Sequence, residues 1–220
     1  MVLLSVITNL WELKMKKILM SVLLIAASIS SASATILTST MNVDNTFNYY
    51  ISTNDAVLGT LVGSGVNWPT TYSNTATLTN NVVNYIHVVA TNQGGPGGFL
   101  GKFTLNNTDF QFDNGSQTLL TNATDWLQNT TGFGNPYSAA VAEGNNGVSP
   151  WGMRSGYGTS NPTWIWNYVS NNGNDFQTVY FSAKINSRQN GDVPEPASIF
   201  LLGLGLAGLA IARQRKNKNL

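Results

Sequence analysis

The sequence contains no cysteine and only one histidine, His87. Without cysteine, the chain has no disulfide staples, no thiolate metal sites and no cysteine nucleophile. A single histidine also excludes a metal site built on a pair of His or Cys ligands. Neither a Gly-x-Ser-x-Gly elbow nor a phosphate loop of the Gly-x-x-x-x-Gly-Lys-Ser/Thr type occurs in the chain. These absences remove the side chains on which most enzyme classes depend.

Charged residues are scarce, at 10% of the chain, and they are unevenly distributed. The net charge of +1 arises because seven of the eleven cations lie in the two terminal segments. Between Thr35 and Asp192, eight acids face four bases, which gives this region a charge of −4. Nucleic acid is therefore not an expected partner, because it requires a basic surface.

The N-terminal segment has the pattern of a secretory signal peptide. Lys14, Lys16 and Lys17 precede an apolar run from Ile18 to Ala27. The cleavage site is predicted at Ala32-Ser33-Ala34, with Ala32 and Ala34 as the small residues that the peptidase requires. We therefore expect residues 1–34 to be a signal peptide, with Met15 as the true start.

The C-terminal segment consists of a motif, an apolar run and a basic end. Pro194-Glu195-Pro196 is followed by the run Ala197 to Ala212, which contains three glycines and no charge. As a helix this run would extend about 24 Å, slightly less than a ~30 Å hydrocarbon core. A basic stop follows it, formed by Arg213, Arg215, Lys216 and Lys218. The pattern predicts a transmembrane helix whose basic end stays in the cytoplasm.

Residues 193–220 resemble the PEP-CTERM sorting tail of Gram-negative bacteria, because all three parts occur in the order typical of that tail. The resemblance implies export and temporary anchoring in the inner membrane. It also implies recognition by an exosortase that cuts near Pro194, and a final location at the cell surface or in the extracellular matrix. Extracellular polysaccharide would then be a partner.

Residues 35–192 are predicted to form one all-β domain. Strand-forming segments recur every eight to twelve residues, separated by turn formers, and this spacing is typical of a β-sandwich. The expected strands are Phe47–Ile51, Ala56–Val62, Ala76–Thr79, Val82–Ala90, Phe99–Leu105, Phe110–Phe112, Leu119–Leu120, Trp164–Trp166 and Thr178–Ile185. We expect an ordered loop system from Thr130 to Thr163, and we assign Trp164 and Trp166 to one core-facing side of their strand.

The middle of the chain resembles the galactose-binding-like jelly-roll sandwiches, in particular the sugar-binding modules of α-L-rhamnosidases and β-galactosidases. The resemblance rests on Asp44-Asn45 before a strand, Ala90-Thr91-Asn92 running into Gly94–Gly98, Pro150-Trp151-Gly152, and Trp164-Ile165-Trp166. The hairpin tip Ser52–Asp55 departs from the Val-Asn-Gly of those modules. The resemblance implies sugar binding, with Asp44, Asn45, Trp68, Asn92 and Pro96 as candidate contacts, and it implies calcium at Asp44 and Asn45.

Each candidate residue also has a simpler interpretation. Asp44 and Asn45 suit an Asx-type turn that starts a strand. Trp68, Trp151 and Tyr157 lie in expected loops, where they would either stack on a sugar or close one end of the sandwich. His87 lies mid-strand and is expected to be structural, and Asp109 and Asp113 are expected to be solvent-facing turn acids.

We therefore expect a non-enzymatic, surface-sorted sandwich that binds exopolysaccharide. A structural matrix or adhesion protein without a defined ligand is the main alternative. A polysaccharide hydrolase is the third, and least favoured.

Overall fold

The computed structural model describes residues 34–167, residues 176–188 and residue 205. The predicted signal peptide and sorting tail therefore lie outside the described residues, except for Ala34 and Gly205. No helix within the described part is long and apolar enough to cross a membrane. The predicted transmembrane run Ala197–Ala212 lies outside the described residues, apart from Gly205.

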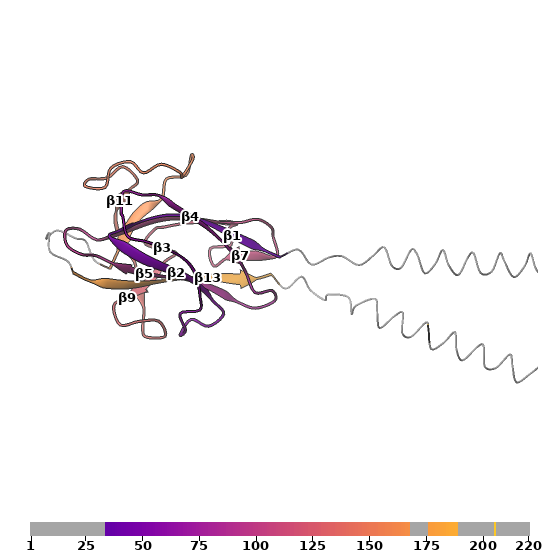
Figure 1. Ribbon diagram of the computed structural model, residues 1–220. Helices are drawn as coiled ribbons and strands as arrows, with labels where there is room; N and C mark the ends of the chain where they lie inside the picture. Colours follow the sequence, from indigo (N-terminus) through magenta and orange to yellow (C-terminus); the bar gives the residue numbers. More distant parts are fainter. Residues whose placement is uncertain (1–33, 168–175, 189–204, 206–220) are drawn as a thin grey trace, which may run out of the picture. The chain divides into compact units, whose positions relative to one another are not determined.

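The described domain is built from strands (Figure 1). Their bounds are β1 (Ile36–Asp44), β2 (Thr46–Ser52), β3 (Thr60–Gly65), β4 (Tyr72–Thr77), β5 (Asn84–Thr91), β6 (Gly98–Leu105), β7 (Phe110–Phe112), β8 (Thr118–Leu120), β9 (Leu127–Asn129), β10 (Ser138–Ala139), β11 (Val141–Asn145), β12 (Thr163–Trp166) and β13 (Thr178–Ser187).

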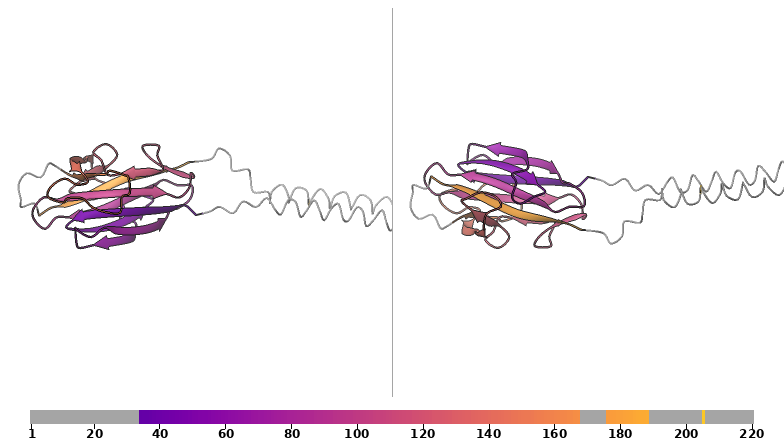
Figure 2. Two further views of the ribbon diagram at one scale, coloured as in Figure 1. Left: turned by 90° about the horizontal axis from the view of Figure 1, so that it is seen from above. Right: turned by 90° about the horizontal axis from the view of Figure 1, so that it is seen from below.

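The strands form two antiparallel sheets, which Figure 2 shows as two layers. One sheet has the order β11-β12-β6-β1-β4, and β8 shares an edge of β6 with β12. The other has the order β10-β9-β13-β5-β2-β3, and β7 and β9 share an edge of β13. The all-β prediction is confirmed, and the two sheets fit the predicted β-sandwich. The galactose-binding-like jelly-roll type stays a prediction.

The main core lies between the two sheets and follows the period-2 alternation of the strands. In β5, Ile86, Val88 and Ala90 are buried in this core, and β13 buries Val179, Phe181, Ala183 and Ile185 in the same way. Contacts between aromatic rings join the sheets: Phe99 of β6 lies 5.2 Å from Phe181 of β13, centroid to centroid. The same core includes Phe103 and Leu105 of β6.

A second hydrophobic cluster, here called the tryptophan cluster, contains Leu100, Trp151, Tyr157 and Trp164, with Trp68 and Val148 packed against it. Trp151 and Trp164 stack with ring centroids 4.7 Å apart. Trp166 belongs instead to the main core. Both tryptophans are fully buried, as the sequence predicts, but they pack in two different clusters.

Two further strand predictions need correction. The partner of β2 begins at Thr60 instead of Ala56, because residues 53–58 form a turn held by hydrogen bonds between Ser52 and Asn54. The segment Thr130–Thr163 is not all loop, since it contains β10 and β11. β1 was not predicted at all, and it is a central strand of its sheet.

Candidate functional site

The predicted sugar-binding residues gather at one end of the sandwich, here called the glycine-loop end. Asp44 ends β1 and is paired in register with Gly98, the first residue of β6. Asn45 follows directly and its backbone N–H donates to Thr91 O, at the end of β5. The loop between β5 and β6, residues 92–97, therefore lies beside Asp44 and Asn45, as the resemblance to the sugar-binding modules implied.

Asp44 is almost completely buried, with 6% of its surface exposed. Trp151 Nε1 donates a hydrogen bond of 2.9 Å to its Oδ2, while its Oδ1 has no hydrogen-bond partner. Burial raises the pKa of Asp44 to about 6, because desolvation disfavours the charged form, and the hydrogen bond from Trp151 partly opposes this rise. A buried carboxylate with one free oxygen is the most unusual polar group of this end.

The amides of Asn45 and Asn92 shape the neighbouring loop. Asn45 Oδ1 accepts from Gln93 N at 2.6 Å, and Asn92 Oδ1 accepts from Gly94 N at 3.2 Å. Asn92 Nδ2 donates to Gly95 O at 2.7 Å. Asn92 thus makes an Asx-type turn with Gly94, two residues further on. The Asx-type turn predicted at Asp44 and Asn45 is not supported, because these side chains bond the distant residues Trp151 and Gln93.

Calcium at Asp44 and Asn45 requires six to eight oxygen ligands. Asp44 Oδ1 is free to contribute, whereas the amide oxygens of Asn45 and Asn92 already accept backbone hydrogen bonds. Within the described residues, no group of three His, Cys, Asp or Glu side chains converges in a way that could hold a metal ion. Of the side-chain oxygens of Asp44 and Asn45, only Asp44 Oδ1 is without a hydrogen-bond partner, and calcium at this end stays a prediction.

Two of the predicted stacking aromatics are closed to a ligand. Trp151 and Tyr157 are each 2% exposed, because they form the tryptophan cluster. The hydroxyl of Tyr157 lies 2.9 Å from Asn42 Oδ1, and burial raises its pKa. For both residues the interpretation as packing residues is the one the structure supports.

Trp68 and Pro96 remain partly exposed, and one further exposed aromatic, Phe176, was not among the predicted contacts. Arg154 lies over the Trp68 ring, with Cζ 5.2 Å from the centroid. Phe176 is 76% exposed and lies beside the glycine loop, near the position that a side chain at Gly94 would occupy. Gly94 and Gly95 have positive φ angles and no side chain, so the surface next to this ring is open. The sequence signal for Phe176 was only an aromatic directly before a strand, because its place beside the glycine loop depends on the pairing of β13 with β5.

His87 lies away from this end, on the outer face of the β13-β5-β2 sheet. It is fully buried, with Nε2 3.0 Å from Asp55 Oδ1 and Nδ1 3.3 Å from Leu58 O. Its ring stacks on Phe133 at 3.8 Å. Both ring nitrogens are engaged and no face of the ring is open to a substrate, so the geometry agrees with the predicted structural role.

Asp55 is the hub of this cluster. Its Oδ1 also accepts hydrogen bonds from Ser182 Oγ at 2.7 Å and from Tyr137 OH at 3.3 Å. Burial, and then the negative charge of Asp55, raise the pKa of Tyr137 to about 12. Because Ser182 is bonded to the carboxylate and not to His87, the group lacks the relay order of a nucleophilic triad. Asp109 and Asp113, also considered as acids, are exposed as the sequence predicts.

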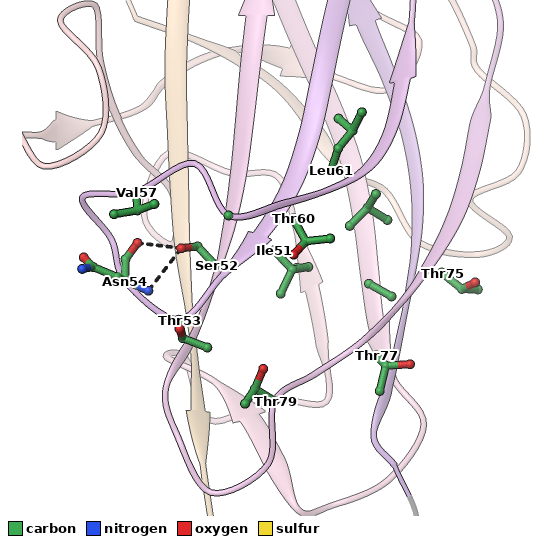
Figure 3. A pocket seen from close by; sticks show the side chains of 13 residues that line it. Ile51, Ser52, Thr53, Asn54, Val57, Thr60, Leu61, Thr75, Thr77 and Thr79 are labelled. Carbon is green, nitrogen blue, oxygen red and sulfur yellow. Dashed lines mark hydrogen bonds between the residues drawn. The ribbon is translucent and has the colours of Figure 1, made fainter.

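A groove of about 620 Å³ lies at one open side of the sandwich (Figure 3). It separates the start of β3 from the end of β4, and the figure shows the threonine side chains along its walls. None of the predicted sugar-binding residues lines it.

The described chain is thus a two-sheet antiparallel β-sandwich with its polar candidate groups at one end. Residues 192–216 match the PEP-CTERM protein-sorting motif. This match confirms the predicted sorting motif, which implies an exported protein that an exosortase processes on its way to the cell surface. The transmembrane helix stays a prediction. No curated protein and no solved structure matches the chain.

Proposed function

We propose that this protein is a non-enzymatic, surface-sorted β-sandwich that binds exopolysaccharide through its glycine-loop end. The sorting motif supports the location, since it directs proteins to the cell surface. The observation that carries the binding role is the exposed ring of Phe176 beside the side-chain-free loop at Gly94 and Gly95. An exposed aromatic next to open backbone is suited to stacking on the apolar face of a sugar ring.

Polar groups near this ring would fix the orientation of the sugar. Asn45 and Pro96 are partly exposed at this end, and the loop is held in one shape by Asn92. A pre-formed loop reduces the entropy cost of binding. Asp44, predicted as a contact, is buried, so we assign it to supporting the loop and Trp151 instead of touching the sugar.

The test is binding of the exported protein to exopolysaccharide purified from its own host, measured by co-sedimentation and then by glycan array. Phe176→Ala is expected to weaken binding at least tenfold. Leu127→Ala, which truncates an exposed apolar side chain on β9, is the matched control and should bind normally. If the wild-type protein is folded and binds no glycan, the alternative of a structural matrix protein without a sugar ligand holds.

Calcium stays a separate prediction with its own test. Addition of calcium after chelation should raise the melting temperature of the wild type and leave that of Asp44→Asn unchanged. No calcium-dependent shift in the wild type would exclude the site.

A further inference from the structure

The open side of the sandwich presents two unpaired strand edges. Within the described residues, β3 pairs with β2 alone and β4 pairs with β1 alone. These two strands end their respective sheets on the same side, where the edge groove lies between them. A free strand edge offers a row of backbone N–H and C=O groups to another strand.

The groove is closed at one end and open at the other. A side chain at Gly65 would collide with the ring of Tyr72, and one at Gly63 would collide with Asn74, so these glycines let the two edges approach each other. Toward Thr60 and Thr77 the edges separate.

Apolar side chains lie at the floor and the mouth of this opening. Ile51 is a buried core residue, and Val62 and Ala76 pack against the same core. Leu61, at 56% exposure, and Val57 are accessible at the mouth.

The absence of charged residues around β3 and β4 limits which partners can bind at these edges. No Asp, Glu, Lys or Arg occurs from Ala56 to Gly101, a stretch that includes both edge strands. The domain elsewhere carries eight acids against four bases between Thr35 and Asp192. Two copies therefore repel each other over much of their surfaces and do not repel across this side. Natural edge strands are commonly protected by lysine, proline, inward charges or β-bulges. β3 and β4 have no lysine, proline or charge, and β3 has one register shift, opposite Tyr49 and Tyr50.

Other occupants fit less well. An anionic or cationic polymer would find no charged partner among the residues that line the groove. A neutral glycan would find no aromatic ring among them to stack on. An uncharged extended strand satisfies the backbone edge and covers Leu61, and the same uncharged edge exists on every copy of this chain.

We propose that β3 and β4 are a self-association surface, at which a second copy of this chain pairs edge to edge. Both edges lie on one side, so a two-fold axis closes the contact into a dimer, with antiparallel pairing as in the sheets themselves. Antiparallel pairing of a strand with its own copy is self-complementary, which suits such an axis. This inference rests on the proposed function in one respect only: the proposed surface location sets where the copies meet.

The absence of cysteine makes the test direct. Single variants Ser64→Cys on β3 and Thr75→Cys on β4 place one thiol on each exposed edge position. Ser116→Cys, in the exposed turn after β7, is the control. In the processed protein as its host exports it, a short bismaleimide linker should cross-link the two edge variants into dimers at least tenfold faster than the control. Equal rates for all three would overturn the proposal.

Lysine substitutions at the two edges provide a second test of the proposal. Leu61→Lys and Thr75→Lys are expected to raise the dimer dissociation constant at least tenfold, measured by light scattering over a concentration series. Thr108→Lys, in the exposed loop before β7, should leave it unchanged. Circular dichroism checks that each variant is folded. A wild type that stays monomeric throughout the series, or lysine variants that dimerise normally, would refute the proposal, and neither result would bear on sorting or on glycan binding.

Discussion

Trp151 Nε1 donates a hydrogen bond of 2.9 Å to Asp44 Oδ2, although the two residues are 107 positions apart in the chain. This bond connects the end of β1 to the long segment that precedes β12. It also links the buried carboxylate of the glycine-loop end to the tryptophan cluster. The stability of both regions should therefore depend on the same pair.

The first prediction concerns pH. The pKa of Asp44 is raised from 3.8 to about 6 in the folded protein, so the folded state binds the proton more tightly than the unfolded state. Stability from this group is therefore fully present below about pH 4 and is lost as pH rises through 6. The loss should be roughly 2 kcal/mol, since one pKa unit corresponds to ~1.4 kcal/mol and solvent screens part of the effect.

Asp44→Asn tests this directly, because it removes the charge and keeps an oxygen that accepts from Trp151. Urea unfolding between pH 4 and 8 should show a more stable variant at pH 8 and little difference at pH 4. Asp109→Asn, at an exposed position, is the control. If the unfolding free energies of the wild type and Asp44→Asn changed with pH in the same way, the raised pKa assigned to Asp44 would be wrong.

The second prediction separates the two roles of Trp151. Trp151→Phe keeps a ring against Trp164 and removes the donor, which should cost about 1–3 kcal/mol because the carboxylate then has no partner. Trp151→Ala also removes the stacked ring and should cost about 3–5 kcal/mol. The loss of unfolding free energy in the double variant Trp151→Phe/Asp44→Asn should be smaller than the sum of the two single changes. Additive effects would show that the bond contributes nothing.

The third prediction concerns the Asp55 hub. Asp55→Ala leaves His87, Ser182 and Tyr137 without their shared acceptor, and should cost about 1–3 kcal/mol in chemical denaturation. Asp55→Asn retains one acceptor oxygen and should cost less. If both variants unfolded with nearly the wild-type free energy, the hydrogen bonds to Asp55 would not be holding residues 53–58 on the sheet.

The fourth prediction concerns sorting. Replacing Pro194, Glu195 and Pro196 together by alanine should keep the chain in the inner-membrane fraction of its host, because the exosortase recognises this motif. The wild type should give an intact mass that corresponds to Thr35 to about Pro194, outside the inner membrane. A wild type that keeps its residues to Leu220 would show that the tail is a permanent anchor.

The sequence was most informative where strand-forming residues are concentrated. β5, β6 and β13 were predicted close to their bounds, since each is rich in apolar and aromatic residues and begins after turn-forming or polar residues. β1 was missed because its inward positions include Ser39 between Leu37 and Met41, and this serine is fully buried. Alternation of this mixed kind cannot be distinguished from loop composition by hydrophobicity alone, although the strand is central in its sheet.

The candidate site was harder to predict for a related reason. Period-2 alternation places Trp164 and Trp166 on one face, but it gives no information about a second cluster that can bury one of them separately. Trp151 and Tyr157 were located in a loop region and are nevertheless buried, because their partners come from β1 and β6, far away in sequence. Long-range pairs such as Asp55 with His87 also leave no local pattern.

Both ends of the described domain are attached to one short loop between β6 and β7. Asn106 N donates to Ile36 O at the start of β1, and Arg188 N donates to Asp109 O at the end of β13. The glycine loop lies at the other end of β6. A mechanical force between a terminus of the domain and a polymer bound at the glycine loop therefore acts along the strands. Interstrand hydrogen bonds run across that direction, so the load is shared by whole ladders in shear, a geometry that resists mechanical unfolding.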